Sequence, residues 1–266
     1  MKDSQEFKPY KILPIKTVEQ LVASYHVAEI IKEIRDEILK EEEEVISFEI
    51  PKLEAEAKIS QRAIDLYEKA FNIMKFKPSY VFIAKLGIED IYNFDFKNDP
   101  SVTTSGSADT AHLQKMFSTR FTDLSKIDLE THTLNVFEEA LNQAEKSGRA
   151  SSMSIAILGA LFHDFGKSTK IRSTVMGSGM QRGVKAHAEV SSLYLQDLLL
   201  PKVYNVIDDS YNLTESTDRL VYIVKNHHPA SAKVKEDLEV DFVVKADHNA
   251  RKNEMTEIRG VNKKWN

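Results

Sequence analysis

The sequence contains no cysteine among its 266 residues. This absence excludes a disulfide framework and a thiolate zinc site, so any metal ion must be held by nitrogen and oxygen ligands. A chain without cysteine is also typical of the cytoplasm, where we expect this protein. Its length suffices for one large domain or two small ones with a substantial buried core.

The sequence also lacks a long apolar run and a strong net charge. The longest apolar run, residues 155–162, is far shorter than the roughly 20 residues that span a bilayer, and the polar N-terminal stretch does not resemble a signal peptide. The net charge of −5 does not favour non-specific binding to nucleic acids or membranes. We therefore expect a soluble, unprocessed protein with no membrane partner. A homo-oligomer is compatible with the sequence.

Helical periodicity dominates the chain. Apolar residues from Val18 to Ile38 recur at three- and four-residue spacing, and residues 50–76, with Pro51 near their start, repeat this pattern. Further helices are predicted over residues 131–146, 151–163, 187–199, 216–228 and 239–254. Residues 80–86 are compatible with either a short strand or a buried helical turn. We therefore predict an all-α fold.

A polar stretch at residues 93–110 separates two predicted regions. It is rich in Asp, Ser, Thr, Gly and Pro, a composition typical of loops and linkers. We predict an N-terminal helical region over residues 1–110, which serves as a cap or an oligomerisation surface. We predict a second helical domain over residues 111–266, and the candidate functional residues all lie in it.

This second domain contains a set of histidines and aspartates at the ends of apolar helical segments. They are His132, His163, Asp164, His187, His227, His228 and Asp247. In a helical bundle, each would lie where the core meets a cavity. A single histidine at a helix end is more often a cap or a half-buried core residue, so the prediction rests on the repetition of the pattern. Neutral imidazoles and carboxylates suit divalent manganese, iron, zinc or cobalt, and do not choose among them.

Asp164 is the predicted bridge between two metal ions, because a carboxylate has two oxygen atoms that can bind different ions. Its neighbour His163 cannot point in the same direction from a regular helix, so the pair must straddle a helix end. Gly166 is predicted to stop that helix. Gly159 and Ala160, about one turn before His163, leave room for a neighbouring helix.

Three stretches of this domain resemble the HD superfamily of metal-dependent phosphohydrolases, whose core is a helical bundle with ligands in this order. They are "HTLNV" from residue 132, "LGALFHDFGK" from residue 158 and "ADHNAR" from residue 246. The resemblance covers residues 125–255. We therefore expect an HD-domain helical bundle with an additional N-terminal helical region.

The resemblance also implies a set of metal ligands. One divalent ion would be held by His132, His163, Asp164 and Asp247, and a second by Asp164, His187 and either His228 or His227. Because both of these last histidines are present, the resemblance allows a third ion. The Gly-Tyr-Pro motif of the HD-GYP subfamily, where a third ion occurs, is absent, and "NHHPAS" stands in its place. This absence argues against cyclic di-GMP as the substrate.

Positive charge lies close to the predicted ligands. No acidic residue occurs between Asp164 and Glu189. Within this interval, the three glycines of "MGSGMQRG" (residues 176–183) allow a loop whose backbone N–H groups can meet phosphate oxygens. The basic residues of this interval are Lys167, Lys170, Arg172, Arg182 and Lys185. Arg251, one turn after Asp247, offers either a planar fork for a phosphate or a structural ion pair. We predict that these cations bind the substrate; a plain solvent loop is the alternative for the interval.

These features predict a metal-dependent phosphohydrolase that acts on a phosphodiester or phosphomonoester of a nucleotide-type substrate. Asp164 and Lys167 are its predicted catalytic residues, and Lys167 would either stabilise developing charge or only neutralise the carboxylates. The layout is also similar to MobH-type conjugative relaxases, which implies DNA as an alternative substrate. Tyr194 would be a candidate nucleophile there, although its position in an apolar stripe favours a core residue. A degenerate HD domain that acts as a binding or regulatory module is the second alternative.

Overall fold

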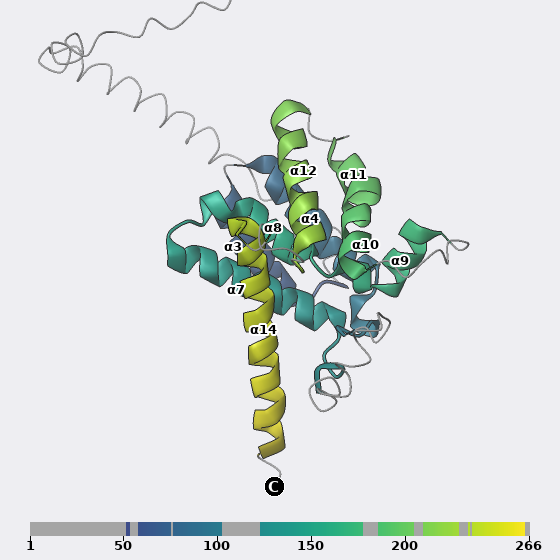
Figure 1. The fold of residues 1–266 in the computed structure, drawn as a ribbon, viewed down its shortest axis with the longest axis vertical. Helices are drawn as coiled ribbons and strands as arrows, with labels where there is room; N and C mark the ends of the chain where they lie inside the picture. The colour runs from purple at the N-terminus through teal and green to yellow at the C-terminus, as the bar shows by residue number, and fades with distance from the viewer. Residues whose placement is uncertain are drawn as a thin grey trace, which may run out of the picture. The chain divides into compact units, whose positions relative to one another are not determined.

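The structure is a computed structural model, drawn in Figure 1. It describes residues 52–53, 58–75, 77–102, 123–177, 186–204, 210–228, 234 and 236–263. All of these belong to a compact unit that spans residues 49–266. The helix predicted around residues 18–38 lies outside the described residues.

The described part of the chain is helical and contains no strand. In chain order, the helices are α3 (Gln61–Met74), α4 (Pro78–Asn93), η2 (Phe96–Asn98), α7 (Leu129–Ser147), η3 (Ser151–Met153), α8 (Ser154–Phe162), η4 (Phe165–Lys167), α9 (Thr169–Met176), α10 (His187–Tyr194), the π-helical η5 (Leu195–Leu199), α11 (Leu200–Tyr204), α12 (Ser210–Asn226) and α14 (Leu238–Lys263). An isolated β-bridge pairs Pro100 with Asp128. The predicted all-α fold is therefore confirmed. None of these helices is long and apolar enough to cross a membrane.

The two helices that precede the polar loop differ from the prediction in detail. Helix α3 begins at Gln61 rather than near Pro51, because the Ser60 side chain accepts a hydrogen bond from the Ala63 backbone N–H and caps the helix there. Residues 80–86 are part of α4, so the helical alternative is correct and the strand is wrong. Pro78 at the first position of α4 favours a helix start, since it needs no hydrogen-bond donor there.

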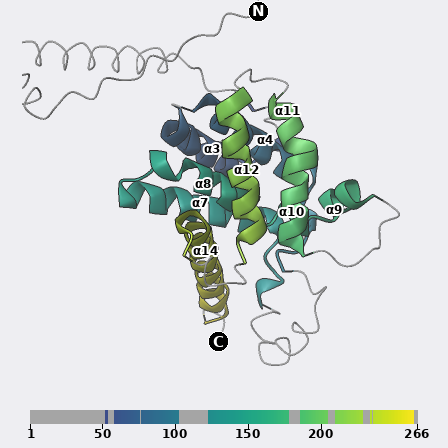
Figure 2. The ribbon, with the colours of Figure 1, turned by 45° about the horizontal axis from the view of Figure 1, so that its top comes forward.

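Helix α8 is the centre of the bundle, as Figures 1 and 2 show. All of its side chains are buried, and it contacts α4, α7, α12 and α14. Gly159 allows the close approach of two of these neighbours: a Cβ atom there would lie 2.6 Å from Ile223 Cγ2 of α12 and 3.2 Å from Val243 Cγ2 of α14. The predicted packing role of Gly159 is therefore confirmed.

Gly166 has a different role from the predicted one. Helix α8 ends at Phe162, before this glycine, and Gly166 does not have the positive φ that favours a helix-stopping glycine. A Cβ atom at Gly166 would lie 2.1 Å from the carbonyl oxygen of His187 and 2.6 Å from the backbone nitrogen of Ser191. Its lack of a side chain thus lets the segment after α8 pack directly against the start of α10.

Helices from both sides of the polar loop pack together. Helix α3 contacts α7, and α4 contacts α8, so residues before and after the loop share one core. The role of residues 1–110 as a cap or an oligomerisation surface stays a prediction. Asp128 begins α7 by accepting a hydrogen bond from the Thr131 backbone N–H, and this cap fixes where the first turn of α7 meets the core.

Candidate metal centre

Five helices bring the predicted histidines and aspartates together at one end of α8. The first turn of α7 and the segment directly after α8 contribute buried residues, and the start of α10, the end of α12 and the middle of α14 complete the cluster. The contributions are His132 from α7, His163 and Asp164 from the end of α8, His187 from α10, His227 and His228 from the end of α12, and Asp247 from α14.

The Asp164 carboxylate lies between two groups of imidazoles. Its Oδ2 atom is 3.3 Å from His132 Nε2 and 3.2 Å from His163 Nε2. Its Oδ1 atom is 3.3 Å from His187 Nε2 and 3.9 Å from His227 Nε2. Each carboxylate oxygen therefore faces a different pair of histidines. Asp164 lies after the end of α8 and directly before the short helix η4.

The first group is completed by Asp247. One potential ligand atom from each of His132, His163 and Asp247 lies within 4.8 Å of the others. The Oδ1 atom of Asp247 is 3.2 Å from His132 Nε2 and 4.0 Å from His163 Nε2. Two imidazoles and a carboxylate, with Asp164 beside them, are the donor types that divalent transition metals prefer.

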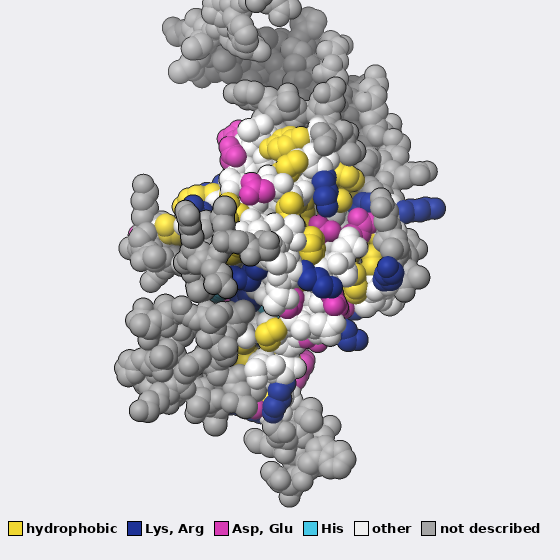
Figure 3. All heavy atoms as spheres, turned by 90° about the vertical axis from the view of Figure 1, so that its right-hand side faces the viewer, with side chains coloured by type: hydrophobic (Ala, Val, Ile, Leu, Met, Phe, Trp, Pro, Cys, Tyr) yellow, Lys and Arg dark blue, Asp and Glu magenta, His cyan; other side chains and the backbone are white. Residues whose placement is uncertain are grey.

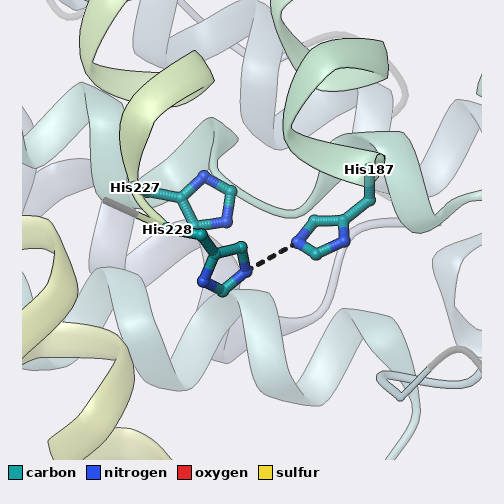
Figure 4. Close-up of side chains that lie close together, drawn as sticks. All are labelled: His187, His227 and His228. Atoms are coloured by element: carbon teal, nitrogen blue, oxygen red, sulfur yellow. Dashed lines mark hydrogen bonds between the residues drawn. The ribbon is translucent and has the colours of Figure 1, made fainter. Parts of the chain in front are cut away.

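The second group consists of His187, His227 and His228, whose potential ligand atoms also lie within 4.8 Å of one another. Figure 4 shows His187 facing the two histidines at the end of α12. The Nε2 atoms of His187 and His228 are 2.9 Å apart, so the hydrogen bond between them needs a proton on one of the two atoms. His227 is buried, whereas His228 is the exposed member of the group.

Several ligand-type atoms in the cluster are buried without a hydrogen-bond partner in the described part of the chain. They are Nε2 of His132, His163 and His227, and Oδ1 of Asp164 and Asp247. The Nδ1 atoms of His163 and His227 donate to the carbonyl oxygens of Ala160 and Val224, at 2.8 and 2.7 Å. Because a carbonyl oxygen only accepts, Nδ1 carries a proton in each ring, and the Nε2 atom of each ring faces the Asp164 carboxylate.

The electrostatics of the cluster suit a bound cation. Burial lowers the pKa of His187 to about 4 and also lowers the pKa of His227. Partial desolvation lowers the pKa of His228, so this group is neutral at pH 7. Burial opposes ionisation of Asp164, yet His163 and Lys167 hold the pKa of Asp164 well below its usual range. The second group thus offers lone pairs, and the carboxylate beside it is ionised.

His132 behaves differently from the second group. Burial and the charge of Arg251 lower the pKa of His132, but the carboxylates of Asp164, Asp247 and Glu254 outweigh them and raise it to about 9. At neutral pH, the metal-free protein therefore keeps a proton on His132. A metal ion would have to displace this proton from Nε2, since the other ring nitrogen is held by Glu254.

A comparison with known protein families identifies the region that contains the cluster. The HD domain family model matches residues 129–252. Residues 129–252 are an HD domain. All seven histidines and aspartates of the cluster lie in this range, and the HD domain places them in a family of metal-dependent phosphohydrolases. Neither the curated proteins nor the solved structures contain a significant match to the chain.

Glu254 is a residue of the HD domain site that the sequence reasoning missed. It is buried, and its Oε1 atom lies 2.9 Å from His132 Nδ1 and accepts a hydrogen bond from Asn135 at 2.8 Å. Its spacing from Asp247 could have identified it from the sequence: Glu254 lies seven residues after Asp247 in α14, and residues seven apart share one helix face.

Of the predicted cations, the structure brings Lys167 and Arg251 to the cluster. Lys167 Nζ is 2.5 Å from Asp164 Oδ2 and donates to the Ser101 carbonyl oxygen at 2.9 Å. Arg251 Nη2 donates to the same carbonyl oxygen at 2.9 Å, and Nη1 lies 3.1 Å from Glu254 Oε2. The predicted ion pair of Arg251 is therefore present. The segment at Ser101, which the sequence did not single out, brings both cations beside the cluster of histidines and aspartates.

The other predicted cations are placed elsewhere or lie outside the described residues. Lys170 forms an exposed ion pair with Asp95 at 3.2 Å, and Arg172 donates to the Gly166 carbonyl oxygen at 2.9 Å. Arg182 and Lys185 lie outside the described residues. Whether these four residues contact a substrate stays a prediction.

Tyr194 is a core residue of the HD domain, as its stripe position favoured. It is fully buried, and its hydroxyl donates to Asp90 Oδ2 at 2.5 Å. Burial and the nearby Asp90 carboxylate raise the pKa of Tyr194 well above its usual range. Both effects oppose the formation of a phenolate nucleophile at this position.

Proposed function

We propose that the protein is a metal-dependent phosphohydrolase that cleaves a phosphodiester or phosphomonoester bond of a nucleotide-type substrate at a dinuclear metal centre. One observation carries this proposal: the two oxygen atoms of Asp164 face two separate groups of metal-type ligands, His132 and His163 on one side, His187 and His227 on the other. A helix-capping or purely structural aspartate needs only one of these partners.

The two groups define the ligands of the proposed ions. His132, His163, Asp164 and Asp247 would hold one ion, and Asp164, His187 and His227 or His228 would hold the other. The buried and unpartnered Nε2 and Oδ1 atoms in both groups support this assignment, because leaving such atoms unsatisfied costs free energy. Because the second group contains three histidines, the proposal allows a third ion there.

The chemistry is assigned from the same residues. Two bound divalent ions supply a water of lowered pKa and a clamp for the phosphate oxygens. Asp164 fixes the relative position of the two ligand groups, and Glu254 orients the His132 ring through Nδ1. Lys167 places an ammonium group beside Asp164, where it can stabilise negative charge that develops on the substrate.

A decisive experiment combines elemental analysis with a substrate panel. Protein purified without chelators is analysed for manganese, iron, zinc and cobalt, and then incubated with mononucleotides, cyclic nucleotides, bis(p-nitrophenyl) phosphate and a supercoiled plasmid. We expect about two ions per chain and release of phosphate or nitrophenol that chelation abolishes.

The same panel separates the alternatives. Nicking of a plasmid that bears the cognate transfer origin, without nucleotide turnover, would favour a relaxase. Protein with no bound metal and no turnover under any metal would favour a degenerate HD domain that acts as a binding module. The convergence of all seven predicted ligand residues argues against that module, because a decayed site has no need to retain them all.

A further inference from the structure

A groove of about 350 Å³ runs beside the second half of α14. Its described lining residues are Leu124, His248, Arg251, Lys252, Met255, Thr256 and Arg259. The α14 members recur at three- and four-residue spacing, so they share one face of the helix. Figures 1 and 2 show this part of α14 extending beyond the helices against which its first half packs. We call this feature the α14 groove.

The α14 groove is positively charged. None of its described lining residues is acidic, and neither Lys252 nor Arg259 has an ion-pair partner in the part of the chain that the structure describes. Other hollows of the molecule differ: the one beside Arg62 is also lined by Glu138 and Glu257. On the face drawn in Figure 3, basic and acidic side chains are likewise interspersed. In a chain of net charge −5, the α14 groove is a local site for an anion.

The α14 groove is continuous with the metal centre through Arg251. The Nε atom of Arg251 lies 3.9 Å from Asp247 Oδ1, and its Nη1 atom lies 3.1 Å from Glu254 Oε2, the carboxylate that contacts His132. The groove is therefore adjacent to Asp247, since its lining includes the next residue, His248, and Arg251 one helical turn after Asp247. It ends at Arg259, about 18 Å from Asp247 along the helix axis, since each helical residue advances about 1.5 Å.

This length decides among phosphate-bearing ligands. A mononucleotide carries its phosphates at one end, so it cannot place phosphates both at the metal centre and at Arg259. A polynucleotide strand repeats a phosphate about every 3.4 Å along a duplex axis, so about five nucleotide steps span the distance from Asp247 to Arg259. Lys and Arg side chains that contact successive phosphates are the usual means of holding such a strand.

We propose that the α14 groove binds a polynucleotide strand whose scissile phosphodiester lies at the metal centre. This inference rests on the proposed phosphohydrolase function and narrows its substrate from nucleotides in general to oligonucleotides or longer strands. Arg251 lies at the junction of the metal centre and the groove, whereas Lys252 and Arg259 contact phosphates further along the strand. The contacts are to the backbone, so the groove holds strands of any sequence.

The test measures binding of fluorescein-labelled, cleavage-resistant phosphorothioate 12-mers, one of DNA and one of RNA, to the full chain by fluorescence anisotropy. The groove variant carries Lys252→Glu and Arg259→Glu. The matched control carries Lys97→Glu and Lys146→Glu, which change the net charge equally at exposed positions outside the groove. We expect the groove variant to bind the 12-mers at least about tenfold more weakly than the control. The slope of its log affinity against log salt concentration should be shallower, corresponding to the loss of about one to two phosphate contacts. The 12-mer that binds more tightly shows whether the groove prefers DNA or RNA.

Three results would overturn the inference: no binding of either 12-mer by the unaltered chain, equal binding by the groove and control variants, or equally effective competition by polyglutamate of the same charge. The last result would assign the groove to an acidic protein partner. Hydrolysis of bis(p-nitrophenyl) phosphate by the unaltered chain is measured in parallel and tests the metal centre alone. If the unaltered chain hydrolyses this small diester but the groove variant binds the 12-mers as tightly as the control does, only the inference fails. Absence of hydrolysis under every metal would overturn the proposed function.

Discussion

The Nδ1 atom of His132 lies 2.9 Å from the Oε1 atom of Glu254, and both side chains are buried. This contact fixes the plane of the imidazole and turns its Nε2 atom toward Asp164 and Asp247. A carboxylate behind a histidine ligand orients the ring and raises its basicity, and such partners contribute to metal affinity without touching the metal. The α14 helix thus supplies both a proposed ligand and, two turns later, the residue that orients another.

Replacing Glu254 by Gln should weaken metal binding at the first ligand group. The amide keeps the size of the side chain but removes the charge that favours a metal-bound imidazole, so we expect the apparent Kd for Mn²⁺ to rise about 10- to 100-fold. Isothermal titration calorimetry measures this change. Glu257→Gln, at an exposed position one turn along the same helix, is the matched control and should bind metal as the unaltered protein does. Equal affinities for the two variants would contradict the orienting role of Glu254.

Replacing Lys167 by Met separates its two proposed roles. Lys167 is not a ligand, and its removal relieves repulsion of a bound cation, so metal content should be unchanged or higher. If the ammonium stabilises developing charge, kcat should fall by about 10²-fold or more. Lys146→Met, at an exposed position outside the cluster, is the control. Full turnover by the Lys167 variant would restrict this residue to neutralising Asp164.

Metal binding should tighten as the pH rises from 7 to about 9. The pKa of His132 in the metal-free protein is raised to about 9, so binding at neutral pH must displace one proton, and affinity should increase up to about tenfold per pH unit until that pKa is passed. The imidazole of His187, with its pKa lowered to about 4, adds no slope in this range. Calorimetry in two buffers of different ionisation enthalpy at pH 7.5 should detect about one proton released. Affinity that does not change between pH 7 and 9 would contradict this account of His132.

Gly166→Ala should destabilise the fold. Its Cβ atom would lie 2.1 Å from the His187 carbonyl oxygen, and a backbone atom cannot move aside as a flexible side chain can, so we expect a loss of about 3 kcal/mol or more in the free energy of unfolding. Gly260→Ala is the control, because nothing lies within 4 Å of a Cβ atom there. An alanine in that helix should stabilise by up to about 1 kcal/mol. Urea unfolding measures both, and similar stabilities for the two variants would refute the close-approach role of Gly166.

Features set by local pattern could be predicted from the sequence. The helices that carry His132, His187 and Asp247 follow from apolar residues at helical spacing, since a helix needs such a stripe to pack. The end of the helix near His163 could be predicted because His163 and Asp164 are adjacent and both face the cluster, whereas adjacent residues of a regular helix point in different directions. These signals lie within a few residues of the features that they predict.

Features set by contacts between distant residues could not be predicted in this way. The Ser101 carbonyl oxygen accepts from both Lys167 and Arg251, but nothing in the residues around Ser101 indicates this position. Lys170 lies in the same basic interval as Lys167, yet its pairing with Asp95 depends on how the turn between α4 and η2 packs. The predicted start of α3 near Pro51 was wrong because Pro51 and Ser60 are both residues that favour the start of a helix. Only contacts in the folded chain determine that α3 begins after Ser60.

The central claim is that Asp164 joins two metal-binding groups, and the metal content of the Asp164→Ala variant tests it most directly. Elemental analysis of chelator-free preparations should find about two divalent ions per chain in the unaltered protein, and should find loss of both from the variant, together with loss of phosphodiesterase activity. Circular dichroism that shows an unchanged helical content would attribute the loss to the missing carboxylate and not to unfolding. Stoichiometric metal and full turnover in the Asp164→Ala variant would contradict the account.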